Sequence, residues 1–139
     1  MGHWEELNVC LLKKKQILEK IAANTETQCR FIHKREMKGL ERVLDEREVL
    51  LDGLARINKK LASDSAWKNA AALAPMVRDI THQQRELLKR SKQVLQEAIA
   101  ERACIAAELK SNTIRRQVKN GYVNPWANIA GGRLINEQG

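Results

Sequence analysis

Residues 75–119 form the longest uninterrupted helical pattern in the chain. This stretch contains no glycine, and its one proline, Pro75, stands at the first position, where a helix makes no use of the backbone N–H. Its apolar residues recur at steps of three, four and their multiples: Val77, Ile80, Leu87, Val94, Ala98, Ile105 and Leu109. About 45 residues at roughly 1.5 Å each span roughly 65 Å. We therefore expect earlier parts of the chain, or another molecule, to lie along this helix.

The composition favours helices throughout. The chain has 139 residues, of which 43% are hydrophobic, yet it holds one Phe and one Tyr. No segment alternates apolar and polar residues over the length of a strand. We predict one all-α domain over residues 1–139, an elongated antiparallel helical hairpin or three-helix coiled-coil bundle with a long C-terminal helix and an irregular tail.

Two earlier helices are predicted, over residues 4–32 and 37–62, with a short break at residues 33–37. The apolar face of the first consists of Leu7, Leu11, Leu18, Ile21 and Ile32, and its polar interruptions are Lys14, Thr25 and Gln28. The heptad row of the second consists of Leu40, Val43, Leu50, Leu54, Ile57 and Leu61, broken only by Arg47. A helix with polar members in its apolar face needs partners. One bent helix over residues 4–62 is the alternative.

The segment between the second and third helices carries capping and anchoring residues. Ser63-Asp64-Ser65 ends the second helix and offers N-cap residues to the next helical segment, and Trp67 is expected to plug the end of the bundle. Pro75 disfavours helical geometry at Ala74. Within the second helix, Gly53 marks either a close helix approach or a tolerated glycine.

The chain changes character at residues 120–139. Asn120-Gly121 predicts the end of the long helix, because both residues adopt the left-handed conformation readily. Beyond it, apolar anchors alternate with Gly, Pro and Asn spacers: Tyr122, Val123, Trp126, Ile129, Leu134 and Ile135. The tail either packs on its own domain or orders on a partner, and the anchor spacing favours the partner.

Charge and cysteine content restrict the function classes. The net charge of +8 and the pI near 9.7 permit an acidic partner or nucleic acid, but acidic residues break most basic runs.

Cys10, Cys29 and Cys104 form no CxxC pair and no ligand spacing with histidines. We therefore expect no metal site and no cofactor, and we expect the three cysteines to be small packing residues. The sequence has no apolar run of about 18 residues that could span a membrane, and its N-terminus does not resemble a signal peptide. We therefore expect a soluble, cytoplasmic protein without membrane insertion.

Motifs of catalysis do not occur in the sequence. It has no glycine-rich phosphate loop, no GxSxG, no HExxH and no paired carboxylates in an apolar setting. His82 is expected to be solvated. We therefore predict a protein that is not an enzyme.

The layout resembles flagellar export chaperones of the FlgN type, a group of FlgN/FliT-like helical secretion chaperones. The run from Leu40 to Leu54 is similar to the family pattern L-E-x-L-x-x-E-[KR]-x-x-L-L-x-x-L. The proline-started helix with Leu87-Leu88 and residues 93–98 is similar to the family's last helix, and Gly121-Tyr122 also resembles the family. The resemblance covers nearly the whole chain.

This resemblance implies a chaperone of flagellar type III secretion in the cytoplasm. Its clients would be the C-terminal helices of hook–filament junction proteins (hook-associated proteins such as FlgK and FlgL), which it would keep from early assembly and deliver to the export gate. A client's amphipathic helix would lie along the long helix. The expected contact residues are Val94, Ala98, Ile105, Leu109, Ile114 and Val118. The resemblance assigns the export gate to Tyr122, and anchor spacing adds Trp126, Ile129 and Leu134.

Two other classes of function stay open. A coiled-coil structural or adaptor protein would assemble through its own heptads as a homo-oligomer. A basic helical nucleic-acid-binding protein would use the net positive charge, although only Lys13-Lys14-Lys15 forms an unbroken basic run of three.

Overall fold

The described part of the chain is almost entirely helical. The structure is a computed structural model and describes residues 2–64, 67–68 and 70–119. Its elements are α1 (Gly2–Lys34), α2 (Met37–Ala62), the short 3₁₀ helix η2 (Ala71–Leu73) and α3 (Ala74–Lys119). No strand occurs in these three ranges, which confirms the all-α prediction with a long C-terminal helix. None of the described helices has the length and apolar character needed to cross a membrane.

The chain divides into two compact units, and the boundary falls inside α3. The N-terminal unit is Met1–Leu95, and the C-terminal unit is Gln96–Gly139. The first contains α1, α2, η2 and the first part of α3, and the described residues of the second are the remainder of α3. A single domain over the whole chain stays a prediction.

α1 and α2 are two helices and not one bent helix, because the chain turns at Arg35 and Glu36. Arg35 adopts the left-handed conformation with φ 56°. The Glu36 N–H donates to the Phe31 carbonyl at 3.0 Å, and the Arg35 N–H donates to the Ile32 carbonyl at 3.2 Å. This pair of bonds is a Schellman motif, which closes a helix and normally places glycine where Arg35 stands. The sequence offered no Gly or Asn here, but the predicted break contains both residues of the turn.

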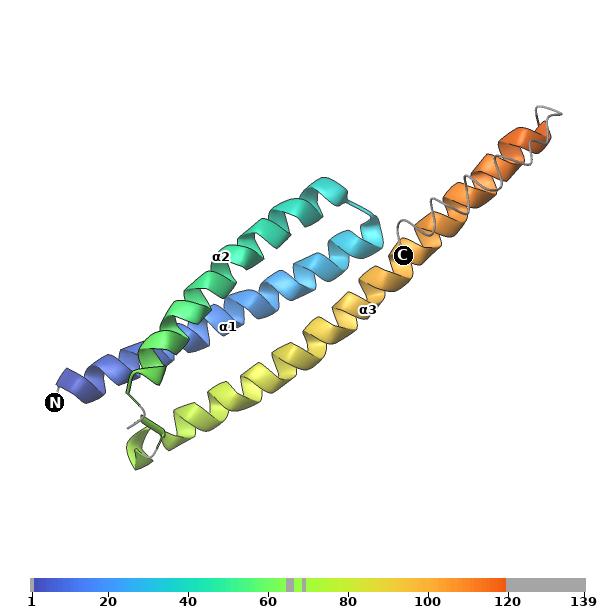
Figure 1. Ribbon diagram of the computed structural model, residues 1–139. Helices are drawn as coiled ribbons and strands as arrows, with labels where there is room; N and C mark the ends of the chain where they lie inside the picture. Colours follow the sequence, from blue (N-terminus) through green and yellow to red (C-terminus); the bar gives the residue numbers. More distant parts are fainter. Residues whose placement is uncertain (1, 65–66, 69, 120–139) are drawn as a thin grey trace. The chain divides into compact units, whose positions relative to one another are not determined.

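The N-terminal unit is built as three helical segments around one core. In Figure 1, α1 and α2 lie side by side in opposite directions, and the first part of α3 runs alongside them. The buried core cluster draws on all three: Leu7, Leu11, Leu18, Ile57, Leu61, Leu73 and Ile80. Each such side chain contributes about 1.5–3 kcal/mol when it is removed from water. The apolar rows predicted for residues 4–32 and 37–62 are the faces that meet here.

The connection between α2 and α3 differs from its prediction at Ala74. Ser63 closes α2, as predicted, since its Oγ donates to the Lys60 carbonyl at 2.6 Å. The predicted capping of the next segment involves Ser65, which lies outside the described residues. Ala74 is helical, with φ −55° and ψ −44°, although Pro75 was expected to disfavour this geometry. The preceding η2 turn already holds Ala74 in place through its bond to the Ala71 carbonyl. Trp67 does pack against the core, and its Nε1 donates to the Leu61 carbonyl at 2.8 Å.

Two glycines in α2 differ in the space around them. A Cβ on Gly39 would lie 3.0 Å from the Phe31 ring, so this glycine permits a close approach of α1 and α2. A Cβ on Gly53 would lie at an ordinary 3.6 Å from Ile17 Cδ1. Gly53 is therefore the tolerated glycine, and the close approach lies at Gly39.

The cysteines fit the packing prediction only in the N-terminal unit. Cys10 and Cys29 are half-buried on α1, whereas Cys104 is exposed. The prediction of a packing role was wrong for Cys104, because its position on α3 lies outside the apolar row.

Candidate functional site

The predicted contact residues on α3 do not form one surface. Val94 is only 3% exposed in the N-terminal unit, so it is unavailable to a partner in this structure. Ala98 and Ile105 are half-buried, and Leu109 is exposed. The sequence could not show this burial, because it arises from packing within the N-terminal unit.

Ile114 and Val118 are exposed but point away from the row that ends at Leu109. Successive residues of an α-helix are about 100° apart, so Ile114 lies roughly 140° around α3 from Leu109 and Val118 roughly 180°. Because α3 continues without a break through these positions, Ile114 and Val118 lie on another side of the helix than Leu109, and their contact with a partner stays a prediction. The four tail residues Tyr122, Trp126, Ile129 and Leu134 lie outside the described residues.

A second apolar row on α2 is left uncovered. Leu44 and Leu51 are 47% and 44% exposed, and they lie seven residues apart on the same side of the helix. Met37, seven residues before Leu44, continues the row and is also exposed. The row borders the buried face of α2 on the side of Arg47, whose Nη2 donates to Ser91 Oγ on α3.

α3 carries a matching row. Leu88 and Leu95 are 58% and 61% exposed and are again seven residues apart. They border the buried side of α3 next to Ser91, which is the side of the hydrogen bond to α2. Both rows therefore flank the junction of α2 and α3 within the N-terminal unit.

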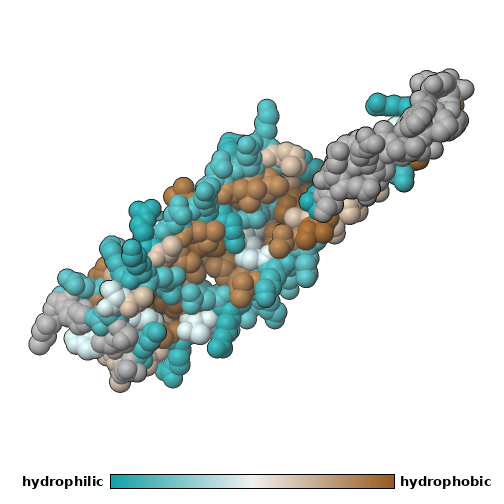
Figure 2. All heavy atoms as spheres, viewed as in Figure 1, coloured by the Kyte–Doolittle hydropathy of each residue, from teal (hydrophilic) through white to brown (hydrophobic). Residues whose placement is uncertain are grey.

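The hydrogen bond between the two helices sets their register. Arg47 Nη2 lies 3.2 Å from Ser91 Oγ, and α2 and α3 run in opposite directions in Figure 1. Residue numbers that rise on one helix fall on the other, so Leu51 lies at about the level of Leu88 and Leu44 at about the level of Leu95. We call these four leucines the α2–α3 face. In Figure 2, hydrophobic side chains gather in a strip along the N-terminal unit between hydrophilic margins.

A polar layer lies beneath this face. Arg47 Nη1 donates to Thr25 Oγ1 at 2.9 Å, and Thr25 in turn donates to the Ile21 carbonyl at 2.8 Å. Beside it, Asn24 Nδ2 donates to the Val43 carbonyl at 2.8 Å. Burial lowers the pKa of Arg47 from its ordinary value, but an arginine remains protonated at physiological pH. The layer ties α1, α2 and α3 together at one level and so fixes the rows of the face.

An ion pair holds α3 to α1 further along. Arg90 contacts both carboxylate oxygens of Glu26, with Nε to Oε2 at 2.8 Å and Nη2 to Oε1 at 2.9 Å. The hydrogen bond from Arg90 lowers the pKa of Glu26, and the positive charges of Arg90 and Arg30 act in the same direction. Since both side chains are partly exposed, the pair orients the helices more than it stabilises them.

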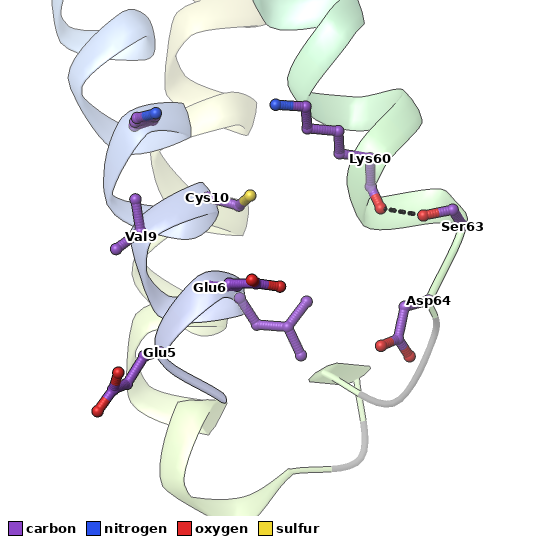
Figure 3. A pocket seen from close by; sticks show the side chains of 9 residues that line it. Glu5, Glu6, Val9, Cys10, Lys60, Ser63 and Asp64 are labelled. Atoms are coloured by element: carbon purple, nitrogen blue, oxygen red, sulfur yellow. Dashed lines mark hydrogen bonds between the residues drawn. The ribbon is translucent and has the colours of Figure 1, made fainter. Parts of the chain in front are cut away.

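A cavity of about 790 Å³ lies between the start of α1 and the end of α2. Figure 3 shows Cys10 and Glu6 directed toward α2 and Lys60 directed toward α1, while Glu5 and Val9 point away. The lining mixes carboxylates with lysines, which favours no single class of ligand. The α2–α3 face is the stronger candidate for a binding site, since all four of its residues are exposed leucines.

The sequence does carry a signal for the face. Positions 37, 44 and 51 keep a seven-residue spacing, one step beside the row that was assigned to the core. A second row next to a core row indicates a helix that packs on two sides. Only the exposure of Leu44 and Leu51 in the structure shows that this second side of α2 is uncovered.

Compared with known protein families, curated proteins and solved structures, the chain matches none of them.

Proposed function

We propose that the protein is a non-enzymatic chaperone that binds an amphipathic helix of a client protein. The observation that carries the proposal is the α2–α3 face, where exposed leucines of two antiparallel helices follow the spacing of a helix-packing surface. An amphipathic helix laid between the rows would remove these side chains from water. The polar layer below supports the same function, because it holds the two rows at a fixed register.

The resemblance to FlgN-type chaperones supplies the identity of the client. On this proposal the protein acts in the cytoplasm as part of flagellar type III secretion. It binds the C-terminal helices of hook–filament junction proteins, prevents their early assembly, and delivers them to the export gate. Covering a helix that would otherwise polymerise is a task for an apolar surface and needs no catalytic group.

The proposed contact residues differ from those expected from the sequence, because Val94 on α3 is buried. The proposal places the client helix on Leu44, Leu51, Leu88 and Leu95 and leaves out Val94, which its own chain covers. The residues predicted further along remain proposed contacts with the client or the export gate: Ala98, Ile105, Leu109, Ile114, Val118, Tyr122, Trp126, Ile129 and Leu134.

Calorimetric titration tests this function. C-terminal segments of the hook–filament junction proteins encoded in the same genome are titrated into the full chain, with an internal segment of the same protein as control. The expected result is saturable binding of the C-terminal segment alone, with a rise in melting temperature, because a ligand that binds only the folded state stabilises it. Absence of binding contradicts the flagellar assignment.

Measurements on the same purified protein distinguish the chaperone from a coiled-coil adaptor and from a nucleic-acid-binding protein. A concentration-dependent oligomer with no affinity for the segments would favour the adaptor. Affinity for DNA or RNA that falls steeply with salt would favour the nucleic-acid binder, because phosphate neutralisation releases counterions.

A further inference from the structure

The apolar row of α2 is bordered by acidic side chains. Glu41 and Glu48 stand three residues before Leu44 and Leu51, so each lies on the outer edge of the row, one turn away from its leucine. Both are exposed. In the described residues neither forms an ion pair or side-chain hydrogen bond.

The apolar row of α3 is bordered by basic side chains at the same spacing. Arg85 and Lys92 stand three residues before Leu88 and Leu95, and both are exposed. Like the two glutamates, they form no ion pair within the part of the chain that the structure describes. The α2–α3 face therefore has an acidic margin along α2 and a basic margin along α3.

We propose that the α2–α3 face takes a single amphipathic helix of another protein, with a basic row on the side next to α2 and an acidic row on the side next to α3. This inference rests on the proposed helix-binding function and specifies its partner. In coiled coils, charges that border the apolar seam select the partner and its direction. Here the opposite margins allow only one of the two directions for a given helix, because reversal would set like charges against each other.

Charge also distinguishes this partner from a second copy of the chain. The chain carries a net charge of +8, so two copies repel each other at low salt. A helix with both acidic and basic rows meets each margin with its complement. The net charge of +8 therefore favours a helix of a different protein with charge of both signs over a second copy, and crosslinking separates the two outcomes.

Designed helices of about three heptads test the proposal against the full chain. The first has a leucine stripe with one lysine flank and one glutamate flank, and two controls carry lysine on both flanks or glutamate on both. We expect the mixed helix to bind roughly fivefold more tightly than either control, because it forms ion pairs along both margins and each exposed pair adds only a little affinity. In the double variant Glu41→Lys/Glu48→Lys both margins become basic, and the preference should pass to the glutamate-flanked helix. An unchanged order of affinities in this variant overturns the proposal.

Two further measurements locate the site. The double variant Leu51→Ala/Leu88→Ala should weaken binding of the mixed helix at least about tenfold, since it removes the apolar contact. Val49→Ala is the control, because Val49 is exposed on another side of α2. An equal loss of affinity in the two variants would show that the helix does not bind at the α2–α3 face.

A photo-crosslinking group at position 51 of the full chain identifies the occupant directly. A crosslink to the designed helix is expected, whereas a crosslink to a second copy or to residues 120–139 of the same chain overturns the proposal. Failure of the flagellar assignment is distinguishable. In that case the designed helix binds as described and the hook–filament junction segments do not.

Discussion

The two parts of α3 have similar helix-forming sequences and different surroundings. Residues 74–95 belong to the N-terminal unit, where Ile80 and Val94 are both 3% exposed. Residues 96–119 belong to the C-terminal unit, and there Leu109, Ile114 and Val118 are exposed. Apolar spacing therefore predicts which side of a helix is available for packing, but the presence of a neighbour decides whether that side is buried.

Local chemistry is sufficient for the helix itself in both parts. No glycine occurs between Gly53 and Gly121, and the one proline in α3 lies in its first turn. The first part is also fixed by side chains from other helices, through Ser91 to α2 and Arg90 to α1. Helix length in this chain is therefore set by helix propensity, whereas the candidate site is set by tertiary packing.

The largest expected difference between the two parts of α3 is in the effect of replacing one valine in each part by alanine. Val94→Ala should lower the free energy of unfolding by about 2 kcal/mol, because it removes two buried methyl groups and leaves a cavity. Val118→Ala should change it by less than about 0.5 kcal/mol, because that side chain is 65% exposed. Urea denaturation followed by circular dichroism measures both, and equal losses would break the comparison.

The polar layer should show coupling that exposed polar residues lack. Arg47→Met and Thr25→Val together should reveal a coupling energy of about 1 kcal/mol in a double-mutant cycle, because the two side chains are hydrogen-bonded and partly buried. The control cycle pairs Arg42→Met with Thr25→Val, since Arg42 is exposed on α2. Additive effects in both cycles would mean that the layer does not connect the helices.

Two glycine substitutions should have opposite signs. Gly53→Ala should raise the free energy of unfolding by about 1 kcal/mol, since alanine favours the helix and the added Cβ meets an ordinary contact. Gly39→Ala should lower it by about 1 kcal/mol, because the Phe31 ring must move. Thermal denaturation of the two variants under one condition checks the order. A stabilising Gly39→Ala would show that α1 and α2 can separate there at little cost.

The ion pair between α1 and α3 should have the smallest effect and a defined pH dependence. Because the pKa of Glu26 is lowered in the folded state, its contribution is present above the unfolded value of about 4.3 and is lost as pH falls through the folded value. Glu26→Gln should therefore cost at most about 0.5 kcal/mol at pH 7 and nothing in strong acid, since the pair is exposed to solvent. Stability curves of both proteins from pH 7 to pH 2 measure the difference. A cost that persists in acid would assign the effect to packing.

Much of the fold could be predicted because its signals are local. The bounds of α2 coincide with the predicted residues 37–62, and the polar interruptions Thr25 and Arg47 are explained by their bond to each other. The helical Ala74 and the glycine at the close approach could not be predicted, because each depends on a neighbour that is distant along the chain or on a preceding turn.

The candidate site was less predictable than the fold. The heptad rule identified the core row of α2, and the parallel row of Leu44 and Leu51 followed the same spacing without being recognised as a surface. Val94 was assigned to a partner because the sequence does not show that this residue is buried within the N-terminal unit. Exposure is a property of the assembled helices, so it had to be taken from the structure.

Methyl NMR of the full chain during titration with a junction-protein C-terminal helix is the most direct test of binding at the α2–α3 face. We expect the methyl signals of Leu44, Leu51, Leu88 and Leu95 to change together, while those of the buried Leu11 and Leu18 stay in place. Binding that leaves the first four signals unchanged, or that moves only the buried pair, would contradict it.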